Sequence, residues 1–176
     1  IVEVPDPRLN ELANIVKPER IVPAVVEFVD IAGLVAGASK GEGLGNQFLA
    51  HIRETDAIVQ VVRCFQNDNV GKVDPLSDIS VIQTELALAD LNTVERVIQR
   101  EIKKAGAGNK ESARLCELLE KVAAHLNKAE PVRSLGLDKE QMELIRPLCL
   151  ITAKPTMYVA NVSDDGFTDN PLLDQL

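Results

Sequence analysis

Two residues three positions apart have the chemistry to hold a metal and a phosphate group. Asp30 ends the β-branched run 21–29, and Gly33 opens a glycine-rich stretch. An aspartate at the carboxyl end of a strand can hold Mg²⁺, usually through water, and a glycine N–H can approach a γ-phosphate because no side chain obstructs it. The spacing therefore predicts a metal ligand at Asp30 and a phosphate donor at Gly33. A strand that ends in an aspartate-capped turn is the alternative.

A second polar pair follows a later run of strand-forming residues. Asn161 and Asp164 come at the end of TMYVANV, residues 156–162. An amide and a carboxylate at the end of a strand suit the recognition of a nucleotide base, with Asn161 bracing the loop and Asp164 meeting the base edge. The same residues also form turns readily, because short polar side chains hydrogen-bond their own backbone. Both readings remain open at this point.

Composition narrows the class of protein. The chain has 176 residues, is 45% hydrophobic and 26% charged, and carries a net charge of −8. These values are ordinary for one soluble domain with an insertion, and the acidity argues against a broad nucleic-acid surface. The three cysteines fit no zinc spacing or disulfide framework, which favours a reducing cytoplasm. No apolar run approaches membrane-spanning length. We expect the chain to begin and end inside a longer protein, because it opens mid-strand on IVEVPDPRLN.

The first part of the chain alternates strands and helices. Proline, glycine and clusters of polar residues divide it into segments. Within each segment, apolar residues at every second position indicate a strand, and apolar residues three or four positions apart indicate a helix. The second clear strand is almost continuously apolar, as buried parallel strands are. The pattern predicts strands at 1–4, 21–29 and 57–65, helices at 8–16 and 44–53, and loops at 32–45 and 66–77.

The next part of the chain is helical. Residues 78–105 contain no glycine or proline, with a cap expected at Ser77 or Asp78, and a GAGN turn separates them from a second amphipathic run at 110–129. Two long helices joined by a short turn must lie antiparallel. A short helix at 138–147 and a strand at 156–162 follow. The class is therefore α/β with a helical insertion.

Several long stretches together resemble one known family. The main one is FVDIAGLVAGASKGEGLGNQFLAHIRETDAIVQVVRCF, and PDPRLNELANIVKPERIVP, TELALADLNTVERVIQR and KPTMYVANVSDDGF agree as well. They resemble the YchF subfamily of Obg-related P-loop NTPases, the Obg-like ATPases. The resemblance implies a P-loop NTPase-type G domain, partial in this chain, with an inserted antiparallel α-helical coiled coil. It also implies Mg²⁺-dependent ATP hydrolysis and association with the ribosome.

The resemblance assigns a role to each motif. Asp30 would be the Walker B metal ligand, and Gly33 would donate its N–H to the γ-phosphate. Asn161 and Asp164 would contact the base, as would the backbone of Val162. Leu34 stands where many related GTPases carry a water-orienting glutamine, and a leucine cannot do that work. The division would be a G-domain part at 1–76 with switch II at 35–45, the coiled coil at 77–131, and a return to the G domain at 132–176.

Three departures from the family qualify these roles. The Walker A loop G-x-x-x-x-G-K-[ST] is absent from the printed sequence, so this chain by itself should bind nucleotide feebly. The loop NDNVGKVDP lacks the histidine expected there, so either the loop is short or residues are missing. Asp164 replaces the usual glutamate, which weakens the ATP preference and makes GTP an alternative.

A basic cluster stands out in this acidic chain. Arg96, Arg100, Lys103 and Lys104 precede the predicted turn between the long helices. A charged helix face is usually just solvated. At a protruding tip, the same residues could contact ribosomal RNA.

The remaining alternative to an enzyme is a non-catalytic coiled-coil docking module.

Overall fold

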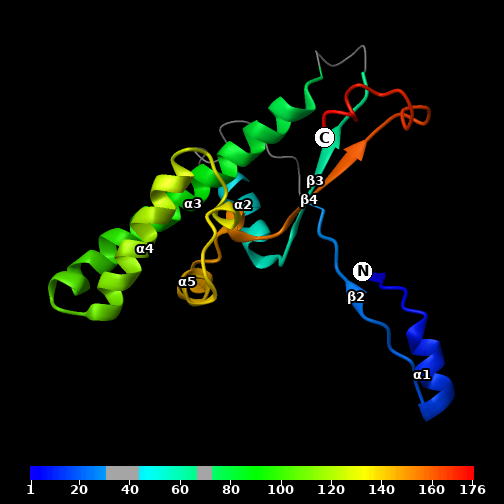
Figure 1. The fold of residues 1–176 in the computed structure, drawn as a ribbon, viewed down its shortest axis with the longest axis horizontal. Coiled ribbons are helices and arrows are strands. Elements are labelled where there is room, and N and C mark those ends of the chain that lie inside the picture. Colours follow the sequence, from blue (N-terminus) through cyan, green and yellow to red (C-terminus); the bar gives the residue numbers. More distant parts are fainter. Residues whose placement is uncertain (31–43, 67–72) are drawn as a thin grey trace. The chain divides into compact units, whose positions relative to one another are not determined.

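The computed structural model describes residues 1–30, 44–66 and 73–176, with no side chains described at 44–48. The described residues form a mixed α/β arrangement (Figure 1). They fall into two units, Ile1–Ala32 and Gly33–Leu176, and each is described by itself. Gly33, Leu34 and the predicted switch II loop up to residue 43 lie outside the described residues. Residues 67–72, most of the loop NDNVGKVDP, also lie outside them.

The first unit is a small hairpin with one helix. Strand β1 (Val2–Glu3) pairs antiparallel with β2 (Val25–Val26), and α1 spans Arg8–Val16. The Asp6 carboxylate fixes the start of α1 by accepting the Arg8 N–H at 3.0 Å and the Arg8 Nη2 at 2.6 Å. Lys17 ends the helix with a left-handed φ of 48°. The helix predicted at 8–16 is therefore confirmed.

The strand predicted at 21–29 is wrong in its length, and its last residues are exposed. Only two of its residues are paired, and Phe28 and Val29 are 61% and 54% exposed. β-Branched residues favour an extended backbone, but a ladder needs a partner strand. Within this unit β1 is that partner, and it is two residues long. The sequence pattern therefore indicates a strand-forming segment without fixing what pairs with it.

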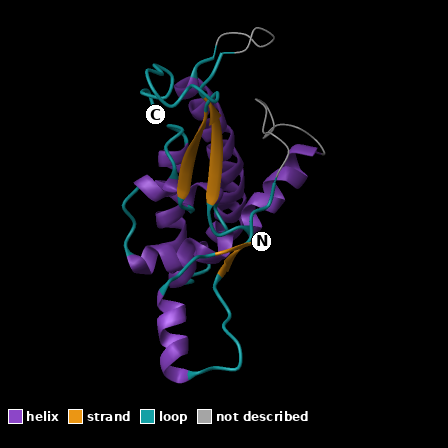
Figure 2. Ribbon diagram, turned by 90° about the vertical axis from the view of Figure 1, so that its right-hand side faces the viewer, coloured by secondary structure: helices purple, strands orange, loops and turns teal. Residues whose placement is uncertain are grey.

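In the described part of the second unit, two parallel strands form a sheet (Figure 2). Strand β3 (Ile58–Arg63) pairs with β4 (Thr156–Asn161) in a register that runs from Ile58 opposite Thr156 to Arg63 opposite Asn161. Both predicted strands are confirmed. The full burial expected for β3 is wrong, because Val62 is 2% exposed whereas Val61 is 65% exposed. The alternation follows from the strand period, which turns neighbouring side chains to opposite faces.

Helices α3 (Pro75–Gly106) and α4 (Lys110–Leu126) form a long pair that lies side by side (Figure 1). The Asp74 carboxylate caps α3 by accepting the Ser77 N–H at 3.1 Å. The cap expected at Ser77 or Asp78 is therefore wrong by one turn, because Pro75 has the fixed φ that suits the first helical position. Asn109 caps α4 through the Ser112 N–H at 3.0 Å, and Gly108 supplies a left-handed φ of 93° in the turn.

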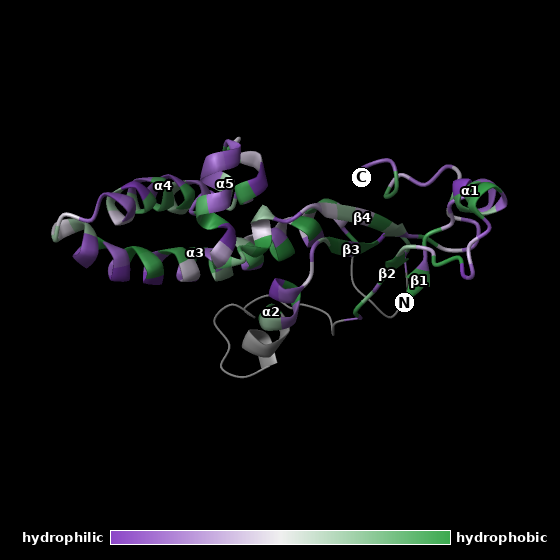
Figure 3. Cartoon of the chain, turned by 90° about the horizontal axis from the view of Figure 1, so that it is seen from below, coloured by the Kyte–Doolittle hydropathy of each residue, from purple (hydrophilic) through white to green (hydrophobic). Residues whose placement is uncertain are grey.

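The core of this unit lies along the helix pair. Figure 3 shows apolar stretches on both helices. Val94 of α3 and Leu119 and Val122 of α4 are fully buried, as expected for apolar residues spaced three and four apart. The other helices in the described part of the unit are α2 (Leu44–Glu54), η2 (Val132–Ser134), α5 (Lys139–Ile145), η3 (Arg146–Leu148) and η4 (Ile151–Ala153). No described helix has both the length and the apolar composition that a membrane crossing requires.

Candidate functional site

The predicted metal ligand Asp30 lies four residues after β2. Its side chain is exposed and has no hydrogen bond or ion pair to a described residue. Its expected companion Gly33 lies outside the described residues. Because Asp30 belongs to the first unit, its position relative to Asn161 in the second unit is not described either. The prediction that these residues share one site therefore remains a prediction.

The predicted base-binding residues lie on one loop at the carboxyl end of β4. The Asn161 carbonyl oxygen accepts the Cys64 N–H at 2.7 Å, which continues the parallel ladder past β3. Asn161 and Asp164 are exposed and Val162 is half-buried. The Ser163 carbonyl accepts the Gly166 N–H at 2.8 Å and closes a turn. The carboxyl ends of parallel strands are where α/β sheets bind ligands, because the connecting loops converge there.

Asn170 holds this loop in place, and the sequence interpretation missed it. Its Nδ2 donates to the carbonyl oxygens of Cys64 and Gly166, each at 2.9 Å. Its Oδ1 accepts the Leu172 N–H at 3.1 Å. Asn170 thus ties the loop after β4 to the end of β3. The Asn-Pro dipeptide at 170–171 is a known turn signal and could have directed attention to this position.

A buried carboxylate joins α3 to the segment that precedes β4. Asp90 is 0% exposed. Its Oδ1 accepts the Ile151 N–H at 2.9 Å, and its Oδ2 accepts the Thr152 N–H and hydroxyl, both at 2.7 Å. Burial raises the pKa of the Asp90 carboxyl, although these hydrogen bonds act in the opposite direction. The three donors compensate for the loss of water around the carboxylate.

The end of α2 is fixed from the same region. The Lys154 Nζ donates to the carbonyl oxygens of Ile52 at 2.8 Å and Arg53 at 2.7 Å, and also to that of Thr55. Burial lowers the pKa of Lys154. The Ile52 oxygen also accepts the Thr55 N–H and hydroxyl. The cation adds to these bonds at the carboxyl end of α2 and opposes the helix dipole. Arg53 in turn donates through Nη2 to the Thr93 hydroxyl of α3 at 2.9 Å.

The basic cluster near the turn between α3 and α4 is partly neutralised. Glu101 is only 6% exposed, and its Oε1 pairs with Lys104 at 2.9 Å and Arg100 at 3.0 Å. Its Oε2 accepts the Ser112 hydroxyl of α4 at 2.9 Å. The Lys104 hydrogen bond, followed by that of Ser112, lowers the pKa of Glu101 to about 2. Two of the four predicted RNA-binding residues therefore pair with an acid of the chain itself.

Comparison with known proteins decides the family. Residues 10–100, which are more than half of the chain, match the family of 50S ribosome-binding GTPases. This chain belongs to that family. A Haemophilus influenzae protein named ribosome-binding ATPase YchF is 59% identical over 180 residues, covering 100% of this chain and 50% of that protein. The Bacillus subtilis protein of the same name is 50% identical, covering 96% of this chain and 47% of that protein.

A solved structure supports the same assignment. The structure named the Schizosaccharomyces pombe YchF GTPase has a TM-score of 0.81 and 39% identity, covering 99% of this chain and 49% of that one. The resemblance to the YchF subfamily is thus confirmed, as is a mixed α/β, P-loop GTPase-like domain that carries the helix pair α3–α4. The chain spans about half the length of the curated YchF relatives it matches.

Replacing Lys154 tests the anchoring of α2. Lys154→Met keeps the length of the side chain but removes three hydrogen bonds to carbonyl oxygens. Hydrogen bonds from a charged donor contribute about 1.5–3 kcal/mol each at most, so we expect a loss of about 1–3 kcal/mol in the free energy of unfolding in urea. Amide exchange near the end of α2 should also increase. Lys128→Met, at an exposed lysine without a described side-chain contact, is the control. Equal stability of both variants would contradict the anchoring.

Acid titration tests Glu101. Its pKa is lowered from 4.5 to about 2, so the folded state binds fewer protons than the unfolded state between these values. The stabilisation is complete above the unfolded pKa and is lost as the pH falls through the folded one. Glu101→Gln should remove this part of the acid sensitivity of the urea midpoint. Glu117→Gln, at an exposed glutamate of α4, should keep the wild-type profile. A Glu101→Gln profile that parallels wild type would contradict the assignment.

Proposed function

We propose that this chain is part of a nucleotide-dependent switch protein that hydrolyses ATP and associates with the ribosome. The observation that carries the proposal is the 59% identity to the Haemophilus protein named ribosome-binding ATPase YchF, which extends over the whole chain. Because the match covers half of that protein, the activity, the nucleotide and the ribosome are proposed for the full-length gene product. We assign that product to the cytoplasm.

The catalytic chemistry would be phosphoryl transfer to water. Asp30 would hold Mg²⁺, and its donor chemistry fits, because Mg²⁺ takes few protein carboxylates alongside water and substrate phosphates. The exposed Asp30 side chain has no described partner that would compete for it. When bound, the metal would neutralise charge on the phosphates. The backbone N–H of Gly33 would stabilise the transferred phosphoryl group in the same way. Leu34 cannot orient water, so another residue must do so.

The loop after β4 would bind the base. Its position at the carboxyl ends of two paired strands supports this role, as does the support that Asn170 gives it. Asn161 would brace the loop, the backbone of Val162 would contact the base, and the exposed Asp164 carboxylate would accept a hydrogen bond from the base edge. Residues 1–76 and 132–176 would then form the nucleotide-binding part.

The helix pair would be the family's antiparallel coiled-coil insertion, which the sequence places at residues 77–131. In the ribosome complex its basic residues Arg96, Arg100, Lys103 and Lys104 would contact RNA. The described structure favours some of them over others. Lys103 is exposed without a described partner, whereas Arg100 and Lys104 pair with Glu101.

Two observations favour GTP as the second candidate nucleotide. Asp164 has the acidic residue type that GTPases use to bind guanine, and the Schizosaccharomyces protein of similar structure is named a GTPase. A carboxylate can accept two neighbouring N–H groups from the edge of guanine, but only the amino group of adenine. A non-catalytic docking module is a third candidate, and the absence of hydrolysis in the full-length gene product would favour it.

Nucleotide titration of the full-length gene product tests the proposal. We expect ATP to bind more tightly than GTP, and Asp164→Ala to weaken binding about tenfold, the equivalent of about 1.4 kcal/mol for one lost hydrogen bond. Asp165→Ala removes a neighbouring exposed carboxylate and should leave the affinity unchanged. Fluorescence of labelled ATP and GTP measures both affinities. Tenfold tighter binding of GTP would overturn the ATP assignment, and equal effects of the two variants would overturn the role of Asp164.

A further inference from the structure

A cavity of about 360 Å³ lies between α2 and α3, both of which belong to the second unit. It is lined by Leu49 and Arg53 of α2 and, from α3, by Ala89, Asn92, Glu95, Arg96 and Gln99. None of these residues is among the nucleotide-binding residues proposed above. The lining combines two guanidinium groups, two amide side chains and the Glu95 carboxylate with the apolar side chains of Leu49 and Ala89. This is the chemistry of a site for a polar, anionic ligand.

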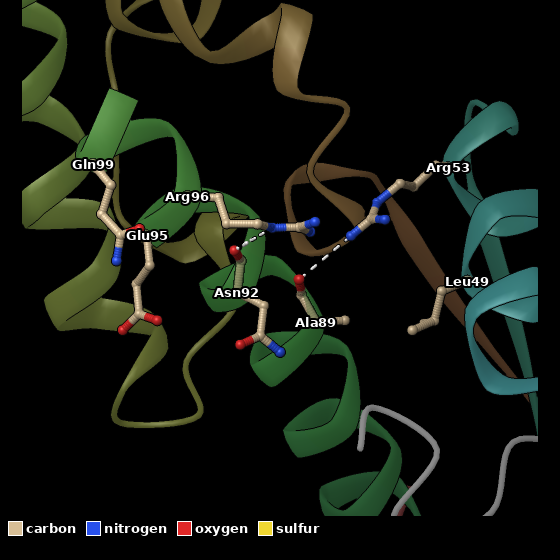
Figure 4. A pocket seen from close by; sticks show the side chains of 7 residues that line it. All are labelled: Leu49, Arg53, Ala89, Asn92, Glu95, Arg96 and Gln99. Carbon is tan, nitrogen blue, oxygen red and sulfur yellow. Dashed lines mark hydrogen bonds between the residues drawn. The ribbon is translucent and has the colours of Figure 1, made fainter. Parts of the chain in front are cut away.

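The two arginines face each other across the cavity (Figure 4). Neither forms an ion pair with a carboxylate in the described part of the chain. The lining carboxylate, Glu95, points away from the space between them (Figure 4). Asp90 lies near enough for Arg53 to lower its pKa slightly, but its oxygens already accept three hydrogen bonds from the segment before β4. Two like charges held close together favour an anion between them.

Both guanidinium groups are held in place by backbone oxygens. The Arg53 Nη2 donates to the Ala89 carbonyl at 3.3 Å as well as to Thr93. The Arg96 Nε donates to the Asn92 carbonyl at 3.0 Å, and its terminal nitrogens have no described acceptor. The Arg53 Nε is buried and also has no acceptor among the described residues. The two terminal nitrogens of Arg96, which is held in place through its Nε, suit the bidentate binding of phosphate, and Arg53 adds a second positive charge.

We propose that the cavity between Arg53 and Arg96 binds a phosphodiester of RNA. This inference rests on the proposed ribosome association and locates a contact for it. Arg96, Arg100 and Lys103 recur at steps of four and three, so they share one face of α3. A phosphate chain could follow this face from the cavity toward the turn at 107–109, where Lys103 is exposed without a described partner. Because the net charge is −8, a backbone contact requires such a local cationic track.

Binding of the full-length gene product to purified large ribosomal subunits tests the inference. Arg96→Gln removes one cation whose described contact lies within its own helix, so the fold should be retained, as a thermal melt can verify. We expect binding to weaken about 5–10-fold in co-sedimentation, and the slope of log K against log salt to decrease by about one. Arg53→Gln should weaken binding at least as much. Arg146→Gln is the control, because it removes an equal charge from an exposed ion pair with Glu143 at 3.3 Å.

Competition identifies the class of ligand. Poly(U) RNA should compete with the ribosomal subunit, and poly-aspartate of equal charge should not. Equal competition by poly-aspartate would overturn the RNA assignment in favour of an acidic protein segment. If the Arg96→Gln and Arg146→Gln variants bound the subunit with equal affinity, the cavity would not be an RNA contact. The proposed ribosome association would still stand.

Failure of the wild-type protein to bind the subunit has a different meaning. It would overturn the proposed ribosome association. Direct binding of poly(U) would then test whether the cavity binds RNA phosphate. A weaker poly(U) affinity for Arg96→Gln than for Arg146→Gln would still support the phosphate site. Equal affinities would overturn it.

Discussion

The second unit depends on one buried carboxylate. Asp90 is fully buried in the middle of α3, and an isolated charge there would be strongly destabilising. Three hydrogen-bond donors from residues 151 and 152 offset that cost. Because the partners are backbone N–H groups as well as a hydroxyl, the carboxylate fixes the path of the chain as it leaves the helical part and approaches β4. An apolar residue of similar size would leave those donors unsatisfied.

The position that Asp90 fixes for the segment before β4 also affects the loop after β4, which we propose binds the base. Thr152 is held by Asp90, Lys154 follows two residues later and anchors the end of α2, and β4 begins at Thr156. At the far end of β4, Asn170 ties the loop to β3. Local contacts thus connect the helix pair, α2 and the loop within one unit. Energetic coupling between sites generally requires such packed and hydrogen-bonded connections.

Local sequence patterns predicted the helices well but did not predict the long-range contacts. The bounds of α1 agree because Pro7 and Pro18 flank it, and α4 begins at Lys110 because the GAGN turn carries its cap, Asn109. The residue that caps α3 was missed, since proline at the first helical position moves the start of the helix into a stretch that resembles a loop. The strand at 21–29 was overestimated because its described partner, β1, is only two residues long.

The candidate site was only partly predictable, because several of its contacts join residues that are far apart in the sequence. Asn161, Val162 and Asp164 form one loop because they are neighbours in sequence. Asp90 and Thr152 are 62 residues apart, and Lys154 contacts Arg53 across 101 residues. An aspartate within an amphipathic helix resembles any solvated acid, so its spacing gives no sign of a buried partner. Likewise, the cavity between Arg53 and Arg96 needs two helices to be placed before its charge pattern is visible.

A double-mutant cycle between Asp90→Asn and Thr152→Val tests the central interaction most directly. Urea unfolding of the two single variants and the double variant gives their coupling energy. Groups that share a buried hydrogen-bond network should be coupled by about 1–3 kcal/mol. The cycle between Asp90→Asn and Glu101→Gln is the control, because Glu101 lies eleven positions after Asp90 in α3 and distant sites should be additive within about 0.5 kcal/mol. Additivity of the Asp90 and Thr152 substitutions within that range would contradict a stabilising interaction between the Asp90 carboxylate and the Thr152 hydroxyl.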